Sequence, residues 1–204
     1  SSLLWEPGTW VNDNTYEILS VLRKKDYASG KIDTLYLGRD RDQNKVVLKQ
    51  IDLSYQGYNA YHREQQLMAS LEHPVLPTLL DHFYDNACYG VLVYPFYPGV
   101  TLQNLMEQRP CLGEVQIYQV LRALGATLIF LQSSYPAVIH GDLKPANILI
   151  GDDGHIRLLD WSSVQLLDAA HTHADFNTTV PYAPPEFSLN YQLHPSFDFY
   201  ALGI

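Results

Sequence analysis

The sequence predicts an α+β protein of two lobes, a small antiparallel sheet with one helix followed by a mainly helical part. Most β-rich runs lie before residue 97, and the character of the chain changes at Tyr-Pro-Gly, residues 97–99. Residues 114–133 then show a long, largely apolar helical pattern. A chain of 204 residues can form one large domain or two small lobes. We therefore expect an N-terminal lobe over residues 1–96, with a lead-in over 1–14, and a second, partial lobe over 97–204.

The overall composition excludes several partners. The formal net charge is −9, whereas a protein that binds nucleic acid needs a basic surface. No uninterrupted apolar run approaches the roughly 18 residues that span a bilayer, and no signal-peptide pattern opens the chain. We expect a cytoplasmic location and no membrane contact within this segment, with a membrane anchor elsewhere in the parent protein left open. The two cysteines form neither a disulfide framework nor a metal site.

The strands of the first lobe place a lysine among apolar side chains. Residues 34–40 and 45–51 are β-rich and are separated by a polar Arg-Asp-Gln-Asn stretch, which predicts a hairpin. Side chains alternate along a strand, so Val47, Lys49 and Ile51 share one face. Lys49 on such a face requires an anionic partner or a route to water.

A glutamate occupies an equally unfavourable position on the predicted helix over residues 58–72. The apolar stripe of this helix consists of Tyr61, Leu67, Met68 and Leu71. Glu64 lies on the same stripe, where a carboxylate is costly unless it is paired. An ion pair between Lys49 and Glu64 would explain both positions. Taken alone, however, these two residues are explained more readily if each extends its charge to water.

The remaining elements follow from hydrophobic runs and turn residues. Residues 73–83 and 88–99 read as two more strands, which complete a small antiparallel sheet packed on one helix. Residues 101–108 form a short helix. The helix over 114–133 is apolar on most faces, so we expect it at the centre of the second lobe.

A polar stretch, His-Gly-Asp-Leu-Lys-Pro-Ala-Asn at residues 140–147, lies between two apolar runs. The turn residues Gly151–Gly154 predict a hairpin, whose outer ends bring Asn147 beside Asp160. An amide oxygen and a carboxylate are hard ligands suited to Mg²⁺. Asp142 and Lys144 lie in the same loop.

Together these groups describe phosphoryl transfer. A metal clamps phosphates, a carboxylate orients an attacking hydroxyl, and a lysine offsets developing charge. Any one of these residues alone is better explained as a turn or cap former. The complete set is not, because its spacing matches a known pattern.

At these residues the sequence resembles the protein kinase family, closest to the serine/threonine kinases of eukaryotic type that bacteria also carry. The stretch 140–147 resembles the catalytic loop H-R-D-L-x-x-x-N, with Asp142 at the base position and Asn147 at a magnesium position. Asp160, in Leu-Leu-Asp-Trp-Ser-Ser, stands where the family has D-F-G. Val-Val-Leu-Lys resembles V-A-I-K and ends at Lys49, while Glu64 falls at the glutamate of helix C.

The resemblance extends over residues 15–204. Thr-Thr-Val-Pro-Tyr-Ala-Pro-Pro-Glu-Phe is similar to the end of an activation segment, and it implies that Thr179 contacts Asp142 and Lys144. Phe-Asp-Phe-Tyr-Ala-Leu-Gly-Ile resembles the start of helix F, whose Asp198 would brace the catalytic loop. The family implies ATP and Mg²⁺ as cofactors, with proteins bearing Ser or Thr hydroxyls as substrates.

The same matching implies an ATP site. Gly30 belongs to the phosphate loop, Tyr94 is the gatekeeper, and Phe96 and Tyr97 lie in the hinge that meets adenine. The side chains implied around the adenine ring are Leu35, Val47 and Leu149. The apolar stack implied between the lobes consists of Leu79, Met68, Trp161 and His140.

The sequence departs from the family at several positions. The phosphate loop G-x-G-x-x-G is matched by Ala-Ser-Gly-Lys-Ile-Asp, which keeps only Gly30, so we expect a weaker grip on phosphate. Gly141 replaces an arginine that pairs with a phosphorylated activation loop, so such phosphorylation is not expected to be needed. Trp161 and Ser162 replace the Phe and Gly of D-F-G. The chain stops at Ile204 inside the matched helix F, so we expect a C-terminally truncated kinase domain that is inactive as a fragment.

Three functions stay open from the sequence. The leading one is a serine/threonine protein kinase, since all six key polar positions are kept and Lys144 is typical of Ser/Thr specificity. The alternative is a pseudokinase that binds a nucleotide or a partner, which the incomplete glycine loop favours. A small-molecule kinase of the aminoglycoside or choline type also uses a His-Gly-Asp loop. Such kinases typically have a histidine or another residue at the position of Lys144, and they lack a segment that ends like Pro-Pro-Glu-Phe.

Overall fold

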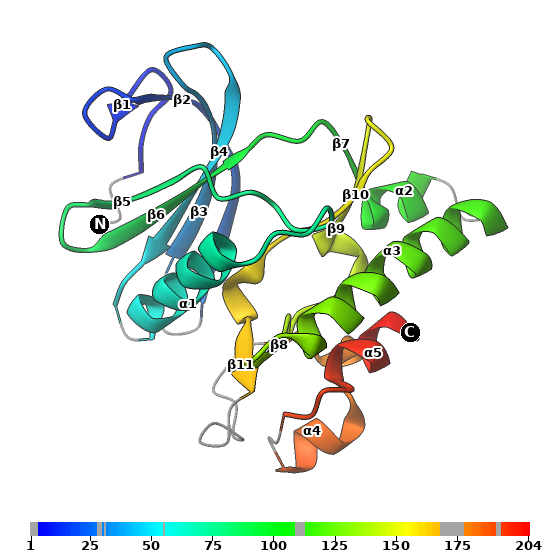
Figure 1. The fold of residues 1–204 in the computed structure, drawn as a ribbon. Helices are drawn as coiled ribbons and strands as arrows, with labels where there is room; N and C mark the ends of the chain where they lie inside the picture. The colour runs from blue at the N-terminus through cyan, green and yellow to red at the C-terminus, as the bar shows by residue number, and fades with distance from the viewer. Residues whose placement is uncertain are drawn as a thin grey trace. The chain divides into compact units, whose positions relative to one another are not determined.

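The computed structural model describes residues 4–27, 30, 32–54, 56–108, 113–167, 178–190 and 193–204, with the side chains of 188–190 left out. The chain divides into two compact units, each described by itself below (Figure 1). Unit 1 comprises Ser1–Glu72 and Pro77–Tyr97, and unit 2 comprises His73–Leu76 and Pro98–Ile204. The predicted α+β class is confirmed. The sequence prediction drew a single boundary after residue 96.

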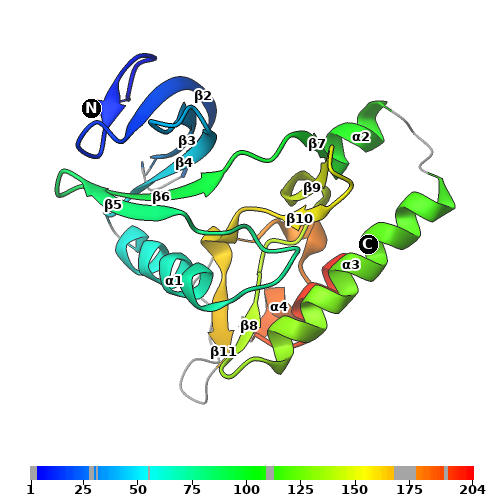
Figure 2. The same cartoon turned by 45° about the horizontal axis from the view of Figure 1, so that its top comes forward.

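Unit 1 is an antiparallel sheet with one helix. Its described strands form a six-stranded sheet in the order β1-β2-β3-β4-β6-β5. The strands are β1 (Trp10–Val11), β2 (Tyr16–Asp26), β3 (Ile32–Arg39), β4 (Lys45–Asp52), β5 (Asp81–Asp85) and β6 (Tyr89–Pro95). Helix α1 (Gly57–Ser70) packs against β4 and β6 (Figure 2). The hairpin predicted over residues 34–51 is confirmed as β3 and β4.

The opposite side of the sheet carries the core of unit 1. This cluster consists of Trp5, Tyr16, Ile18, Tyr36, Val46, Leu48, Val91 and Val93. Val46 and Leu48 alternate along β4 with Val47 and Lys49, so the two sets point to opposite faces. The lead-in is therefore more than a loose tail, because Trp5 is buried in this core.

One predicted boundary in unit 1 is wrong. The strand expected over 73–83 begins only at Asp81, because Pro74 and Pro77 have no N–H to donate to a sheet. Strand β2 begins just after the expected lead-in, and its continuation to Asp26 was not predicted. Its second half is mostly exposed and shows no regular alternation of burial, so periodicity did not reveal it.

Unit 2 combines helices with short strands. Its helices are α2 (Leu102–Gln108), α3 (Glu114–Ser133), α4 (Pro185–Asn190) and α5 (Phe197–Leu202). Its strands are β7 (Gly99–Thr101), β8 (Ala137–Ile139), β9 (Ile148–Gly151), β10 (Ile156–Leu158) and β11 (Gln165–Leu167). They form the ladders β10-β9-β7 and β11-β8 among the described residues. The helices predicted over 101–108 and 114–133 and the hairpin after residue 147 are confirmed.

Residues 73–76 group with unit 2 for identifiable reasons. The ring of His73 stacks on Phe130 of α3 with a centroid distance of 4.8 Å. The N–H of Leu158 donates to the carbonyl oxygen of Val75 at 2.8 Å. These contacts attach the segment to α3 and β10.

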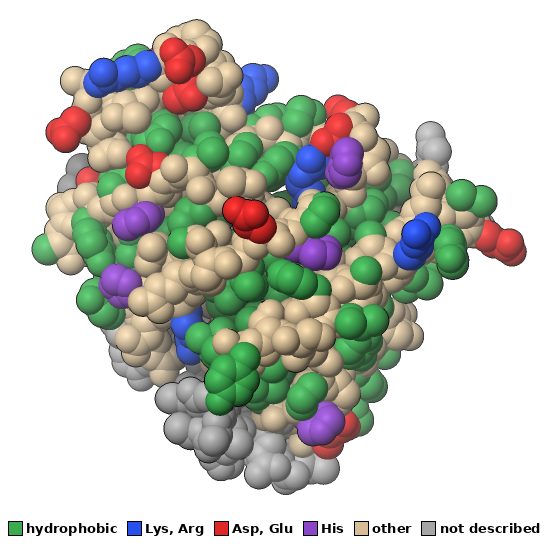
Figure 3. Space-filling view, in the orientation of Figure 1, with side chains coloured by type: hydrophobic (Ala, Val, Ile, Leu, Met, Phe, Trp, Pro, Cys, Tyr) green, Lys and Arg blue, Asp and Glu red, His purple; other side chains and the backbone are tan. Residues whose placement is uncertain are grey.

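Helix α3 buries one face and exposes the other. Its buried residues are Val120, Leu124, Thr127, Leu128 and Leu131. Large apolar side chains are exposed on the remaining surface, with Val115 at 70% and Ile129 at 61%. Figure 3 shows hydrophobic side chains, in green, at the surface over this helix. The expectation of burial on most faces is therefore met on one side only. By length and composition α3 also qualifies as a helix able to cross a membrane, a test that core helices of soluble proteins pass too.

Candidate active site

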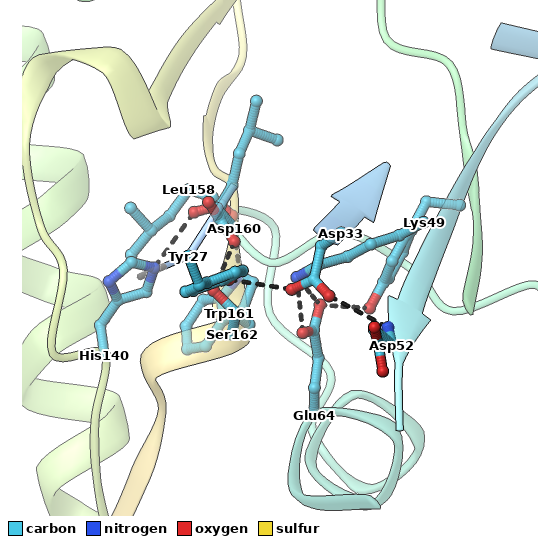
Figure 4. Close-up of polar contacts among 12 residues, drawn as sticks. Tyr27, Asp33, Lys49, Asp52, Glu64, His140, Leu158, Asp160, Trp161 and Ser162 are labelled. Atoms are coloured by element: carbon cyan, nitrogen blue, oxygen red, sulfur yellow. Dashed lines mark hydrogen bonds and ion pairs between the residues drawn. The ribbon is translucent and has the colours of Figure 1, made fainter. Parts of the chain in front are cut away.

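In unit 1, Lys49 and Glu64 form a buried ion pair (Figure 4). Nζ of Lys49, on β4, lies 2.6 Å and 2.9 Å from the two carboxylate oxygens of Glu64, on α1. The residues are only 6% and 1% exposed. Tyr94 on β6 donates its hydroxyl to Oε1 of Glu64 at 3.0 Å. The alternative in which both charges extend to water is therefore wrong, and the pair explains why each residue is tolerated inside.

Several predicted ATP-site positions share the sheet face that carries Lys49. Leu35 on β3 pairs directly with Lys49, and Val47 pairs with Tyr94 on β6. Directly opposed side chains of an antiparallel pair point to the same side. Leu35, Val47, Lys49 and Tyr94 therefore lie on one face, the side on which α1 packs.

The predicted hinge residues make contacts within unit 1. The N–H of Phe96 donates to the carbonyl oxygen of Lys45 at 3.1 Å, and Nζ of Lys45 lies 5.7 Å from the centre of the Phe96 ring. The hydroxyl of Tyr97 accepts from the N–H of Thr78 at 3.3 Å. The Phe96 amide is thus used by the sheet itself, so it is not the hinge group that would meet adenine.

The predicted phosphate loop lies between β2 and β3. The two strands pair as far as Asp26 and Ile32, and Gly30 lies between them with φ +83°. The N–H of Gly30 donates to the carbonyl oxygen of Tyr27 at 2.9 Å. The glycine that the sequence keeps in this loop therefore stands where the backbone favours glycine.

In unit 2, Asp142 is the centre of a polar cluster. Its Oδ1 accepts from the hydroxyl of Thr179 at 2.6 Å, and its Oδ2 accepts from Nζ of Lys144 at 2.7 Å. Lys144 also donates to Thr179 at 2.8 Å. Nδ2 of Asn147 donates to the backbone oxygen of Asp142 at 2.8 Å and to its Oδ2 at 3.2 Å. The contacts of Thr179 that the resemblance implied are present, and the roles of these residues stay predictions.

The β9–β10 hairpin brings Asn147 and Asp160 to the same end, as the sequence predicted. The N–H of Leu159 donates to the carbonyl oxygen of Asn147 at 2.7 Å. Asp160 has left-handed backbone angles, φ 58° and ψ 77°, and its Oδ1 accepts from the Ser162 hydroxyl at 2.8 Å. Nδ2 of Asn147 is directed at Asp142, so its amide oxygen is the atom available to a cation.

This donor set fits Mg²⁺ rather than a metal that a protein holds by itself. Mg²⁺ is usually held by one or two carboxylates together with substrate phosphates. Asp160 and Asn147 supply one carboxylate and one amide oxygen. The described residues contain no group of three or more His, Cys, Asp or Glu side chains that would form a complete metal site.

Asp198 of α5 braces the loop from the far end of the sequence. Its Oδ2 accepts from the N–H of His140 at 2.7 Å, and its Oδ1 accepts from the N–H of Gly141 at 3.0 Å. Burial raises the pKa of Asp198, while His140 and these two N–H groups favour its charged form. Gly141 has φ +81°, so the loop itself favours glycine where the family has arginine.

Most of the predicted apolar members of the site are buried. In unit 2 the rings of His140 and Trp161 meet edge to face at 4.6 Å. The indole N–H of Trp161 donates to the carbonyl oxygen of Leu158 at 2.9 Å. Nε2 of His140 lies 3.1 Å from the carbonyl oxygen of Leu159. Leu149 is buried in unit 2 and Met68 in unit 1, whereas Leu79 is half-buried.

Comparison with known proteins identifies the family. The model of the protein kinase domain matches residues 23–204. The chain is 31% identical over 185 residues to the serine/threonine-protein kinase PknL of Mycobacterium tuberculosis, a match that covers 87% of this chain and 45% of that protein. It is 28% identical over 186 residues to the probable serine/threonine-protein kinase glkA of Dictyostelium discoideum, covering 86% of this chain and 36% of the relative. The chain belongs to the protein kinase domain family.

The relatives are longer than this chain, and the share of each that the chain covers differs. U-box domain-containing protein 33 of Arabidopsis thaliana is 31% identical over 185 residues, with 86% of this chain and 22% of that protein covered. The chain thus spans less than half the length of these relatives. The family places the domain among ATP-using transferases, and it includes serine/threonine kinases of bacterial, plant and amoebal origin.

Proposed function

We propose that this domain transfers the γ-phosphoryl group of ATP to serine or threonine hydroxyls of proteins. The observation that carries the proposal is the Asp142 cluster, in which a lysine, an amide and a hydroxyl all lie within hydrogen-bond distance of one buried carboxylate. A turn or cap would not need a buried carboxylate with three side-chain partners. Such a set is suited to an attacking hydroxyl and a transferred phosphoryl group.

The chemistry assigns a role to each member of the cluster. The substrate hydroxyl oxygen attacks the γ-phosphorus, the bond from that phosphorus to the ADP oxygen breaks, and the hydroxyl proton passes to Asp142. Lys144 offsets the negative charge that develops on the transferred group. Thr179 holds Asp142 and Lys144 in register through its hydroxyl.

The remaining residues handle the nucleotide. Lys49, oriented by Glu64, supplies positive charge to the phosphates. Asp160 and Asn147 would hold Mg²⁺, which neutralises phosphate charge when it is bound. Specificity for Ser and Thr is supported by Lys144 two residues after Asp142 and by the names of the relatives.

A second candidate is a domain that binds a nucleotide without useful transfer. It is favoured by the phosphate loop, where Gly30 is the one glycine kept and Asp33 stands at the last glycine position. The complete polar set around Asp142 favours catalysis instead. Transfer of phosphate separates the two candidates directly.

The test measures transfer of labelled γ-phosphate from Mg-ATP to a generic basic protein by the full-length protein. Asp142→Asn is expected to lower the rate about 10²- to 10⁴-fold, because the proton acceptor is lost, with little change in ATP affinity. Asp152→Asn is the matched control, since Asp152 is exposed in the β9–β10 turn and should leave the rate unchanged. Equal rates in the wild type and Asp142→Asn, or no transfer by the folded wild type, would refute the proposal.

A further inference from the structure

An open pocket of about 340 Å³ lies beside β1 in unit 1. The residues that line it in the described part of the chain are Trp10 of β1, Asn14 of the β1–β2 turn and Arg41 of the β3–β4 turn. Residues 4–16 and 39–45, which contain these side chains, are described without a gap. None of the three residues belongs to the candidate active site.

The pocket depends on residues that precede the matched family domain. The model of the protein kinase domain matches residues 23–204, so Trp10 and Asn14 lie outside the match and Arg41 lies within it. Strand β1 pairs with β2, which places this part of the lead-in on the edge of the sheet. The pocket is therefore formed where an added strand meets a turn of the domain, and membership of the family does not assign it.

The turn that supplies Asn14 has an unfavourable backbone. Asn12, Asp13 and Asn14 are successive left-handed residues, with φ of 51°, 52° and 58°. This conformation is disfavoured for residues that carry a Cβ, although Asn and Asp tolerate it best. Nδ2 of Asn12 donates to Oδ2 of Asp81 on β5 at 3.0 Å, which holds the turn on one side. Strained backbone of this kind persists where surrounding contacts hold it, and it is concentrated at functional sites such as ligand clamps.

Arg41 holds the same turn from the other side. Its Nε donates to the carbonyl oxygen of Asn14 at 2.8 Å, and its Nη2 donates to the carbonyl oxygen of Asp13 at 2.9 Å. These two contacts use one edge of the planar guanidinium. Among the described residues Arg41 makes no other hydrogen bond and no ion pair. The edge formed by Nη1 and Nη2 therefore keeps two parallel N–H donors, the arrangement that binds both oxygens of a carboxylate.

The charges around the pocket favour a single negative charge on the ligand. Arg39 is already paired with Glu17 at 2.7 Å, so Arg41 supplies the positive charge of the pocket. Asp13 and Asp42 are sequence neighbours of lining residues, and both are exposed. They repel a doubly charged phosphate about twice as strongly as a carboxylate. One guanidinium with acidic neighbours therefore suits a carboxylate better than a phosphate.

Trp10 provides the apolar part of the pocket. The residue is 42% exposed on an edge strand, and no other ring packs on it within the described part of the chain. Trp and Arg are enriched among the residues that dominate binding at protein interfaces. A small pocket that is open to solvent suits one or two side chains of a peptide rather than an enclosed cofactor.

We propose that this pocket binds a short acidic segment of a partner protein. An Asp or Glu carboxylate of that segment meets the Nη1–Nη2 edge of Arg41, and a neighbouring apolar side chain packs on Trp10. The held turn keeps both surfaces in place before binding, which reduces the entropy lost on association. The inference goes beyond the proposed function and does not depend on it.

The test uses the full-length protein labelled with fluorotryptophan, in which the Trp10 signal is the one missing from Trp10→Phe. Titration with acetyl-Phe-Glu-amide, followed by fluorine NMR, should shift this signal until it saturates. Acetyl-Phe-Gln-amide should bind about tenfold or more weakly, because it lacks the charge-assisted pair. Arg41→Gln should bind both peptides weakly and equally. Arg122→Gln is the matched control, since it removes an exposed arginine of α3 and should keep the preference for the Glu peptide.

Three results would overturn the inference. The first is a Trp10 signal that does not respond to the Glu peptide in the wild type. The second is an Arg41→Gln variant that binds both peptides more weakly by the same factor and keeps the preference, because Arg41 would then only shape the turn. The third is tighter binding of acetyl-Phe-phosphoserine-amide than of the Glu peptide, which would assign the pocket to phosphate.

A second variant keeps the test decisive if thermal melting shows that Arg41→Gln does not fold. Arg41→Lys keeps the positive charge, but an ammonium group cannot present two parallel N–H donors. The preference for the Glu peptide over the Gln peptide should therefore fall without disappearing. An unchanged preference in Arg41→Lys would show that the guanidinium edge does not bind the carboxylate.

Discussion

The two central carboxylates, Glu64 in unit 1 and Asp142 in unit 2, are held in opposite ways. Glu64 gives both oxygens to one ammonium group, and the side chain of that lysine is only 8% exposed. Asp142 divides its oxygens among three different side chains, and its lysine partner keeps 23% of its side chain exposed. The carboxylate of unit 1 therefore fixes a buried cation, whereas the carboxylate of unit 2 has a cationic partner that stays partly exposed.

The contrast extends to what each unit retains of the family pattern. Unit 2 keeps Asp142, Lys144 and Asn147 of the catalytic loop, although Gly141 replaces its arginine, and a distant aspartate, Asp198, accepts hydrogen bonds from that loop. Unit 1 keeps its ion pair but has an aspartate where a phosphate loop has its last glycine. The sequence thus retains more of the family's catalytic loop than of its phosphate loop. The affinity for ATP and the rate of phosphoryl transfer should therefore be measured separately.

Breaking the ion pair of unit 1 should give the largest loss of stability. Glu64→Ala leaves Lys49 buried without its partner, which is expected to cost about 3–5 kcal/mol of unfolding free energy. The double variant Lys49→Met with Glu64→Leu should recover most of this loss, because apolar side chains replace both charges. Urea unfolding of the three proteins measures both effects. A loss below about 1 kcal/mol for Glu64→Ala would mean that water already reaches Lys49.

Removing one hydrogen-bond acceptor of Asp198 in unit 2 should cause a smaller loss of unfolding free energy. Asp198→Asn offers one oxygen to two N–H donors, so one buried donor is left unsatisfied at a cost of about 1–3 kcal/mol. Urea unfolding near neutral pH measures the loss. An unchanged midpoint would show that the loop holds its shape without the carboxylate.

The same variant should change the pH dependence of stability. Burial raises the pKa of Asp198, so the folded protein binds that proton more tightly than the unfolded chain. Wild-type stability should therefore fall as the pH rises from the ordinary aspartate range through the raised pKa. Asp198→Asn should lack this fall, and a series of urea titrations across acidic pH tests it.

Removing one hydroxyl from the Asp142 cluster should give the smallest change. Thr179→Val deletes the donor to Asp142 at 2.6 Å, and the loss of one hydrogen bond predicts about a tenfold lower transfer rate. Thr179→Ser keeps the hydroxyl and should retain most of the rate. If the Ser variant loses as much activity as the Val variant, the hydroxyl by itself does not explain the role of Thr179, and the prediction is wrong.

Local patterns were enough to predict much of this arrangement. The periodicity of α1 placed Glu64 on the buried stripe, and alternation along β4 placed Lys49 on a sheet face. The Gly151–Gly154 turn predicted the hairpin that brings Asn147 and Asp160 together. These contacts follow from sequence because each depends on one helix, one strand or one turn, whose geometry neighbouring residues determine.

Other features depend on residues far apart in the chain. The sequence alone left the Lys49–Glu64 pair undecided, since helix and sheet must pack before two long side chains can meet. The burial of Asp33 was not foreseen, because its partners are Tyr27, which follows β2, and Asp52 at the end of β4. The strand predicted over 73–83 begins only at Asp81, and residues 73–76 are instead held by α3 and β10 of unit 2.

The sequence by itself therefore determined the class of fold, its main elements and the polar residues of the two units. Periodicity, turn chemistry and motif spacing carry that information because they act over a few residues. Only the tertiary structure decided which charges are buried, which carboxylates are paired and which faces of a helix are covered. Those outcomes depend on packing between distant segments, where the cost of burying a charge is set by partners that no local pattern names.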